Sequence, residues 1–182
     1  MAKVIIALAN GFEEVEALAQ ADLLRRVGAE VRLLAVTEDI VVKGARGINV
    51  VADGMLCDAN WQETEMLILP GGMPGTTYLA QSDMVHEGIR YMLEHDRYVA
   101  AICAAPALVL GEHGYLEGGR ATCYPGMEEH LKGAVALTDN VVTFGRIITS
   151  RGVGTALELG ITLVKALYSK EIADKLALDI VY

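Results

Sequence analysis

Short, unbroken apolar runs constrain the fold of this chain more than any other feature. Two of them, Lys3–Ala9 and Glu30–Val36, flank a segment of helical character that ends at Gly28. Runs of this kind, with β-branched residues among them, are typical of strands buried on both faces of a parallel sheet. Glycine suits the end of a helix because it adopts a positive φ without strain. The pattern predicts a β-α-β unit with parallel strands and a right-handed crossover.

The same alternation continues along the rest of the chain. Further buried strands are expected at Met66–Leu69 and Tyr98–Ile102, with a helix over Asp83–Glu94 between them. Residues 40–51 alternate poorly and are expected to form a hairpin at a sheet edge. Alternating strands and helices predict an α/β sandwich with a mostly parallel sheet, in one domain over residues 1–182.

Composition excludes several classes of function. A net charge of −9 argues against the basic face that nonspecific nucleic-acid binding needs. No apolar run approaches the roughly 18 residues of a membrane span, and the N-terminal run is too short for a signal peptide. Three cysteines, an odd number, fit unpaired thiols in a reducing cytoplasm better than a disulfide framework. No metal-ligand spacing or nucleotide-binding fingerprint is found, so we expect no metal and no cofactor.

Cys103 follows directly on the apolar run Tyr98–Ile102, and small residues come after it. With a helix expected to reach His113, this position is a strand-to-helix turn of the kind that aims a nucleophile at solvent. A helix N-terminus beside the sulfur favours thiolate over thiol. The alternative is a small core residue, since free cysteine is often buried.

Parallel sheets bind ligands beyond the carboxyl ends of their strands, where the strand order switches. Three loops are expected to meet at that edge, over residues 10–16, 70–75 and 103–106. Their convergence favours the functional interpretation of Cys103. The position of Glu16 in the sequence by itself predicts a solvated acid on a helix surface. Glu13 and Glu14 are equally good candidates for any acidic role in the site.

Four motifs together resemble the ThiJ/PfpI superfamily. The motifs are residues 13–16, 69–72, 100–106 and 150–155. They occur in the family's order, and the resemblance covers nearly the whole chain. The sequence is most similar to the parkinsonism-associated protein deglycase branch. The resemblance implies a flavodoxin-like three-layer sandwich and a homodimer. It also implies glutathione-independent glyoxalase or deglycase activity on small dicarbonyls such as methylglyoxal and glyoxal, with oxidative-stress sensing and chaperone-like behaviour.

The resemblance also implies roles for individual residues. Cys103 corresponds to the reactive thiol and Glu16 to its partner carboxyl. The backbone amides of Gly72 and Ala104 correspond to the oxyanion donors, and Gly71, which directly precedes Gly72, is a further possible contact of the site.

Three further residues match positions near the family's site. Arg46 and Arg26 correspond to positions near the site and the dimer contact. Tyr124 stands where many members carry a histidine before a proline, here Pro125. Its neighbour Cys123 is a candidate to resolve an oxidised Cys103 as a disulfide, or else a core residue.

The tyrosine leaves two main functions open. The first is an enzyme that acts on small dicarbonyls through Cys103. The second is a noncatalytic redox-sensing or chaperone-like protein in which Cys103 is oxidised. A cysteine peptidase of the PfpI kind ranks last, because such hydrolases need a histidine close to the nucleophile and no His-x-Glu pair is present.

Overall fold

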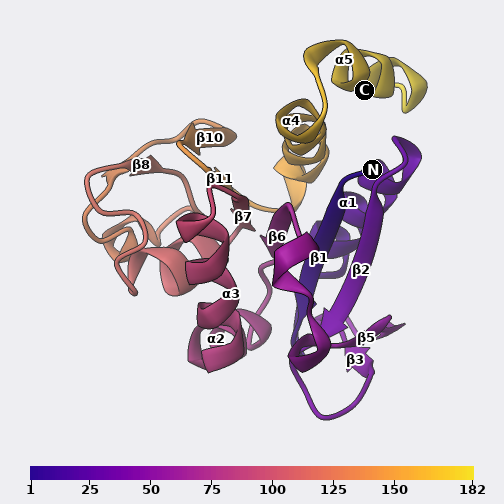
Figure 1. Cartoon of the computed structure of the whole chain (residues 1–182). Helices are drawn as coiled ribbons and strands as arrows, with labels where there is room; N and C mark the ends of the chain where they lie inside the picture. Colours follow the sequence, from indigo (N-terminus) through magenta and orange to yellow (C-terminus); the bar gives the residue numbers. More distant parts are fainter.

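A seven-stranded sheet forms the centre of the computed structural model, which describes residues 1–182 (Figure 1). Its strand order is β10-β11-β7-β6-β1-β2-β5, and all neighbours are parallel except β10 and β11. The strands are β1 (Lys3–Leu8), β2 (Glu30–Ala35), β5 (Gly54–Met55), β6 (Met66–Leu69), β7 (Tyr98–Ile102), β10 (Val141–Phe144) and β11 (Ile147–Ser150). The predicted α/β sandwich with a mostly parallel sheet is confirmed.

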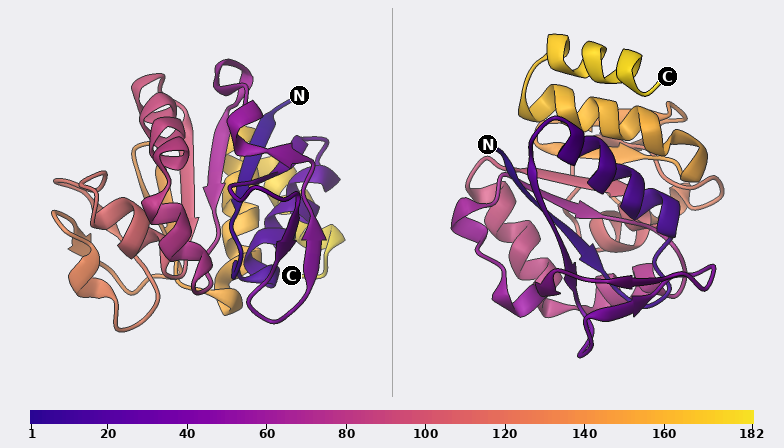
Figure 2. Two further views of the ribbon diagram at one scale, coloured as in Figure 1. Left: turned by 90° about the horizontal axis from the view of Figure 1, so that it is seen from below. Right: turned by 90° about the vertical axis from the view of Figure 1, so that its right-hand side faces the viewer.

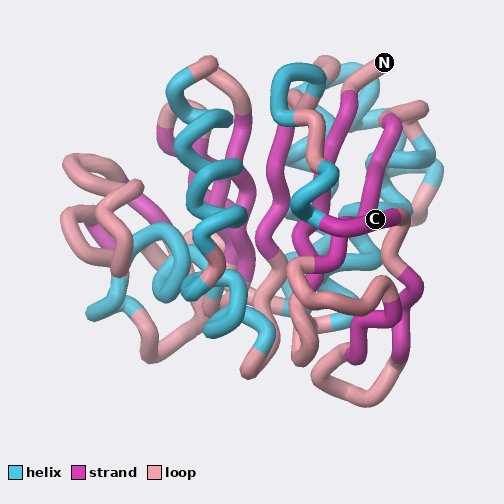
Figure 3. The backbone as a smooth tube through the Cα atoms, turned by 60° about the horizontal axis from the view of Figure 1, so that its bottom comes forward, coloured by secondary structure: helices cyan, strands magenta, loops and turns pink.

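Helices cover both faces of this sheet, so that the strands lie between two helical layers (Figures 2 and 3). One layer holds α1 (Glu14–Arg26), α4 (Ala156–Leu167) and α5 (Lys170–Asp179). The other holds α2 (Gly75–Gln81), α3 (Asp83–Glu94) and the π-helix η3 (Pro106–Gly111). Short 3-10 turns complete the helical segments: η1 (Leu56–Asp58), η2 (Trp61–Glu63), η4 (Glu128–His130) and η5 (Val153–Thr155).

Local sequence explains the ends and faces of these helices. On α3, Val85, Ile89 and Met92 are fully buried at helical spacing, and the Ser82 hydroxyl accepts a hydrogen bond from the Val85 amide at 3.4 Å. Gly28 ends the segment after α1 with a φ of +84°, as the sequence predicted. Packing of these apolar stripes on the two sheet faces gives two separate cores.

Three local expectations are corrected by the structure. The hairpin of β3 (Val41–Lys43) and β4 (Asn49–Val51) forms a two-stranded sheet of its own, and β5 takes the edge of the main sheet instead. The segment after Cys103 is a π-helix rather than an α-helix to His113. Helix α2 was not expected, since it follows directly on a Gly/Pro-rich loop. A second two-stranded sheet pairs β8 (Arg120–Ala121) with β9 (Val135–Ala136).

The strand order explains where a site can form. The chain passes from β1 outward to β2 and β5, then returns to β6, β7 and β11 on the other side of β1. The carboxyl ends of β1 and β6 therefore mark the switch in strand order. The loops after β1, β6 and β7 meet at this edge, as expected. None of the helices combines the length and apolar character that crossing a membrane requires.

Candidate active site

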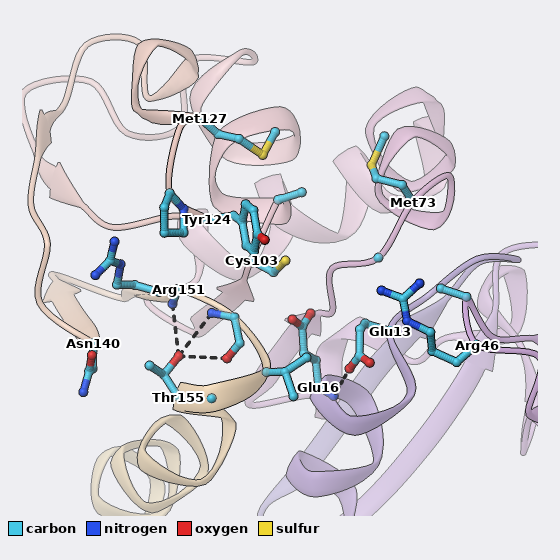
Figure 4. Close-up of a pocket in the computed structure, with 17 residues that line it drawn as sticks. Glu13, Glu16, Arg46, Met73, Cys103, Tyr124, Met127, Asn140, Arg151 and Thr155 are labelled. Atoms are coloured by element: carbon cyan, nitrogen blue, oxygen red, sulfur yellow. Dashed lines mark hydrogen bonds between the residues drawn. The ribbon is translucent and has the colours of Figure 1, made fainter.

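Cys103 lies on a sharp turn directly after β7. Its φ is +66°, a conformation that non-glycine residues rarely adopt and that stores strain. Two hydrogen bonds hold the turn: the Cys103 amide donates to the Ser150 carbonyl at 3.0 Å, and its carbonyl accepts from the Tyr124 amide at 2.8 Å. The side chain is half-buried and faces the cavity drawn in Figure 4. This is the geometry of a nucleophile elbow.

Glu16 lies in the first turn of α1, below Cys103 in Figure 4, and its side chain is fully buried. The Glu13 carboxylate caps the helix by accepting from the Glu16 amide at 2.9 Å. Glu16 Oε2 accepts from the Gly71 amide at 2.8 Å, whereas Oε1 has no partner. Burial raises the pKa of Glu16 to about 7, against the hydrogen bonds from Gly71 and Cys103, which lower it. Glu16 is therefore not a solvated surface acid.

Two glycines make this close approach of α1 and Cys103 possible. A Cβ on Gly71 would lie 2.5 Å from the Cys103 Cβ and 2.6 Å from Glu16 Oε2. Gly72 has a φ of +90°, and a Cβ there would lie 2.4 Å from the Glu13 nitrogen. Side chains at either position would separate the thiol from the carboxyl.

The thiol and the carboxyl titrate as a coupled pair. Burial, and then the ionised Glu16 beside it, raise the pKa of Cys103 to about 12, while the amides of Ala104 and Gly72 donate to the sulfur and lower it. A neutral Glu16 removes the repulsion and can donate its proton to the sulfur. A thiolate in this site is therefore favoured only together with a protonated carboxyl.

An open cavity of about 840 Å³ surrounds the sulfur. Apolar side chains form much of its rim, with Met73 55% and Tyr124 52% exposed and Met127 half-buried. Arginines stand on two sides: Arg46 from the β3–β4 turn and Arg151 from the loop after β11. The space is large enough for a small organic ligand that reaches from the thiol to either guanidinium.

The structure brings most of the candidate residues to this one cavity. Those lining it are Cys103, Glu16, Gly72, Ala104, Tyr124 and Arg46, and Gly71 lies directly against the first two. Arg26 does not line the cavity. It follows Glu16 by ten positions, roughly 15 Å along the helix, and pairs with Asp22 at 2.7 Å on the exposed surface.

Cys123 is buried beside the site rather than open to it. It is 2% exposed, and its thiol donates to the Tyr124 carbonyl at 3.4 Å. Burial raises its pKa to about 11. No group of three or more His, Cys, Asp or Glu side chains is arranged to hold a metal ion.

The sequence did not indicate what several residues in or beside the cavity do. Glu14 is buried, and its Oε1 accepts from the Arg46 amide at 2.7 Å and the Ile48 amide at 3.3 Å. The Thr155 hydroxyl ties down the loop after β11 by accepting from the Arg151 and Gly152 amides, both at 3.2 Å. The 150–155 motif was the only sequence signal for this loop, and nothing in the sequence connected Glu14 to residue 46.

The fold and the site together define a class of proteins: a flavodoxin-like sandwich with a strained cysteine beside a buried glutamate at the switch in strand order. Residues 2–166 match the model of the DJ-1/PfpI family, and the chain belongs to this family. The resemblance seen in the sequence motifs is thereby confirmed.

Individual relatives agree with this assignment. The chain is 41% identical to Protein DJ-1 homolog A of Arabidopsis thaliana over 96% of its own length and 45% of the relative's. It thus spans less than half of that protein. It is 34% identical to the glutathione-independent glyoxalase DJR-1.2 of Caenorhabditis elegans, covering 90% of this chain and 87% of the relative. The structure of oxidized Toxoplasma gondii DJ-1 matches with a TM-score of 0.95 at 34% identity, over 100% of this chain and 99% of the other.

Proposed function

We propose that this protein is a cysteine-dependent, glutathione-independent glyoxalase that converts small α-oxoaldehydes such as methylglyoxal and glyoxal to α-hydroxy acids. The observation that carries the proposal is the contact of Cys103 with the buried Glu16 at the floor of an open cavity. The glyoxalase name of the Caenorhabditis elegans relative gives independent support. Deglycase action on adducts of the same dicarbonyls would start from the same thiol.

The chemistry needs a nucleophile, an oxyanion site and a group that moves one proton. The Cys103 thiolate adds to the aldehyde carbon and forms a hemithioacetal. The amides of Gly72 and Ala104, which lower the pKa of the sulfur and line the cavity with it, are the donors we expect for the new oxyanion. Glu16, with a pKa raised to about 7, is suited to both giving and taking a proton near neutral pH.

The remaining steps balance without any external oxidant. Glu16 transfers a proton from the former aldehyde carbon to the adjacent keto carbon, which yields a thioester of the α-hydroxy acid on Cys103. Water then cleaves the thioester, releases the acid and restores the thiol. One molecule of methylglyoxal and one of water give one lactate.

The first experiment is to measure lactate formed from methylglyoxal by the purified protein. Cys103→Ser should abolish turnover, and Glu16→Gln should lower kcat by at least about a hundredfold, as is typical of a general acid–base residue. Cys57→Ser is the matched control, since that cysteine is exposed and lies outside the cavity. Full activity in Cys103→Ser would exclude the mechanism.

Redox sensing through Cys103 is the second candidate, and Tyr124 favours it. The tyrosine lines the cavity at the position where many members carry a histidine, so the site has no imidazole for proton transfer. A sulfinate at Cys103 could accept from the amides of Gly72 and Ala104 and from a protonated Glu16. A wild-type protein inactive on methylglyoxal but oxidised first at Cys103 would favour this function over the enzyme.

A homodimer is expected, because dimers are common among DJ-1 proteins. Three free cysteines fit a cytoplasmic, reducing environment. Small aldehydes or dicarbonyls are the ligands that the cavity would take.

A further inference from the structure

The Cys103 cavity is much larger than methylglyoxal. Its volume of about 840 Å³ is within the range of roughly 300–1,000 Å³ that holds ligands of drug size. Methylglyoxal would occupy only the floor, between Cys103 and Glu16. The upper walls are therefore available to a second group on a longer substrate.

The charges on these walls favour an anion. Arg46 is exposed, lines the cavity and forms no salt bridge within the chain. In Figure 4 its side chain reaches toward the space between Met73 and Glu13. Arg151 stands on the opposite side, but its guanidinium is drawn outward by a hydrogen bond to the Thr138 carbonyl at 3.2 Å. Arg46 is thus the cation directed at a ligand on Cys103.

Two acidic residues also line the cavity, and neither cancels this preference. The Glu13 carboxylate is engaged as the cap of α1, where the positive end of the helix dipole offsets its charge. Glu16 holds a proton over part of the neutral range. Because an Arg guanidinium presents a planar fork of donors, it matches a carboxylate in both charge and shape.

Glu14 fixes the backbone that carries Arg46. It is 3% exposed, and its Oε1 accepts from the amides of residues 46 and 48 on the β3–β4 turn. The turn packs so closely on it that a Cβ at Gly44 would lie 2.3 Å from the same oxygen. A buried carboxylate from α1 therefore holds the turn against the site.

We infer that the cavity is suited to α-oxoaldehydes with a carboxylate at their far end, that Arg46 binds this carboxylate, and that Glu14 positions Arg46. The inference rests on the proposed glyoxalase function and specifies its substrate class. A suitable probe is γ,δ-dioxovalerate, which the reaction would convert to α-hydroxyglutarate. The aldehyde carbon is oxidised to a carboxyl, the keto carbon is reduced to an alcohol, and one water is consumed.

The test compares this probe with isopentylglyoxal, in which an isopropyl group of the same size replaces the carboxylate. The wild type should prefer the charged compound in kcat/KM. Arg46→Met should lower kcat/KM for γ,δ-dioxovalerate by about two- to fivefold, mainly through KM, as loss of an exposed ion pair predicts. Turnover of isopentylglyoxal should stay within about twofold. Arg120→Met, on an exposed arginine outside the cavity, is the matched control.

Glu14 is tested through the same preference. Glu14→Ala frees the turn and should reduce the preference for the charged compound as much as Arg46→Met does. Glu14→Gln keeps an acceptor oxygen for the amides of Arg46 and Ile48, so this variant should retain the preference for the charged compound. A merely structural role for Glu14 would instead lower the turnover of both compounds equally. Should Glu14→Ala not fold, Glu14→Gln and the exposed Arg46→Met still decide the matter.

Alkylation gives a readout that does not need turnover. The ratio of Cys103 rate constants for iodoacetate and iodoacetamide, which differ in charge, should fall about fivefold in Arg46→Met. The same ratio at exposed Cys57 should not change. If neither aldehyde is turned over but this ratio falls, the glyoxalase proposal fails and anion binding by Arg46 stands. Equal use of both aldehydes, with an unchanged alkylation ratio, would overturn the inference.

Discussion

Replacing Glu16 with glutamine should make the protein more stable at pH 8 than the wild type. The wild-type carboxyl is fully buried, and burial raises its pKa from an ordinary 4.5 to about 7. Between these two values the unfolded chain has released the proton while the folded chain still holds it. Stability from this group is therefore complete below pH 4.5 and is lost as the pH rises through about 7. A glutamine at position 16 is neutral at every pH, so the variant does not lose this stability as the pH rises.

The size of the effect follows from the pKa difference. A pKa higher by about 2.5 in the folded chain corresponds to about 3 kcal/mol in the free energy of unfolding. Unfolding by urea at constant protein concentration, in a thiol reductant, measures it at pH 4, 6 and 8. The advantage of Glu16→Gln over the wild type should be near zero at pH 4 and reach about 2 to 3 kcal/mol at pH 8. Other carboxyls affect both proteins equally and cancel.

Glu14→Gln is the matched control, with the opposite sign. Burial works to raise the pKa of Glu14, but its amide hydrogen bonds, including those from Arg46 and Ile48, outweigh burial and lower it. The stability that this carboxylate contributes is present above its ordinary pKa and is lost as the pH falls. Glu14→Gln should therefore be less stable than the wild type at pH 8 and by the same amount at pH 6, and the gap should begin to close only as the pH falls below about 4.5. A Glu16→Gln curve parallel to that of the wild type would refute the reasoning.

Three further substitutions or treatments test the rest of the site. Gly71→Ala should lower the Cys103 alkylation rate at least about tenfold and reduce Tm, because the added Cβ would lie 2.5 Å from the Cys103 Cβ. Gly154 also lines the cavity, but a Cβ there would meet open space, so Gly154→Ala should change neither the rate nor Tm. Tyr124→Phe should keep methylglyoxal turnover within about twofold of the wild type, because the Tyr124 hydroxyl hydrogen-bonds to neither Cys103 nor Glu16. A larger loss of turnover would assign the hydroxyl a role in proton transfer. Peroxide should add two oxygens to Cys103 before it reacts with exposed Cys57 or buried Cys123, as peptide mass spectrometry can measure. Equal labelling of all three cysteines would show that Cys103 is not a privileged thiol.

The parts of the fold that could be predicted from the sequence are those set by local pattern. Unbroken apolar runs identified β1, β6 and β7 because strands buried on both faces carry no alternation. The two-stranded sheet of β3 and β4 was misplaced because exposed and buried residues alternate over only three positions in each strand. Short elements give too few residues for a period to be read, and long-range contacts decide their position.

In the candidate site, too, only the residues marked by a local sequence pattern could be predicted. Cys103 could be found because a strand, a cysteine and small residues are adjacent in the sequence. Glu16 could be chosen over its neighbours only by family resemblance, since Glu13, Glu14 and Glu16 are all acidic residues at the start of one helix. In the folded chain Glu13 caps the helix, Glu14 clamps the β3–β4 turn and Glu16 is the partner of the thiol. The roles of Glu14 and Glu16 depend on residues more than thirty positions away, which no local pattern encodes.

The strain at Cys103 and the cost of burying Glu16 occur in one place, and the fold explains why that place tolerates them. A positive φ at a non-glycine residue costs about 1 to 3 kcal/mol and persists only where its surroundings fix the backbone. Strand β7 is paired along its length with β6 and β11, and the Cys103 carbonyl is held by the Tyr124 amide. The same turn on β5 or β10, at the sheet edges, would have a neighbouring strand on one side only and could relax. A strained thiol beside a neutral buried carboxyl is therefore expected on an inner strand next to the switch in strand order, as observed here.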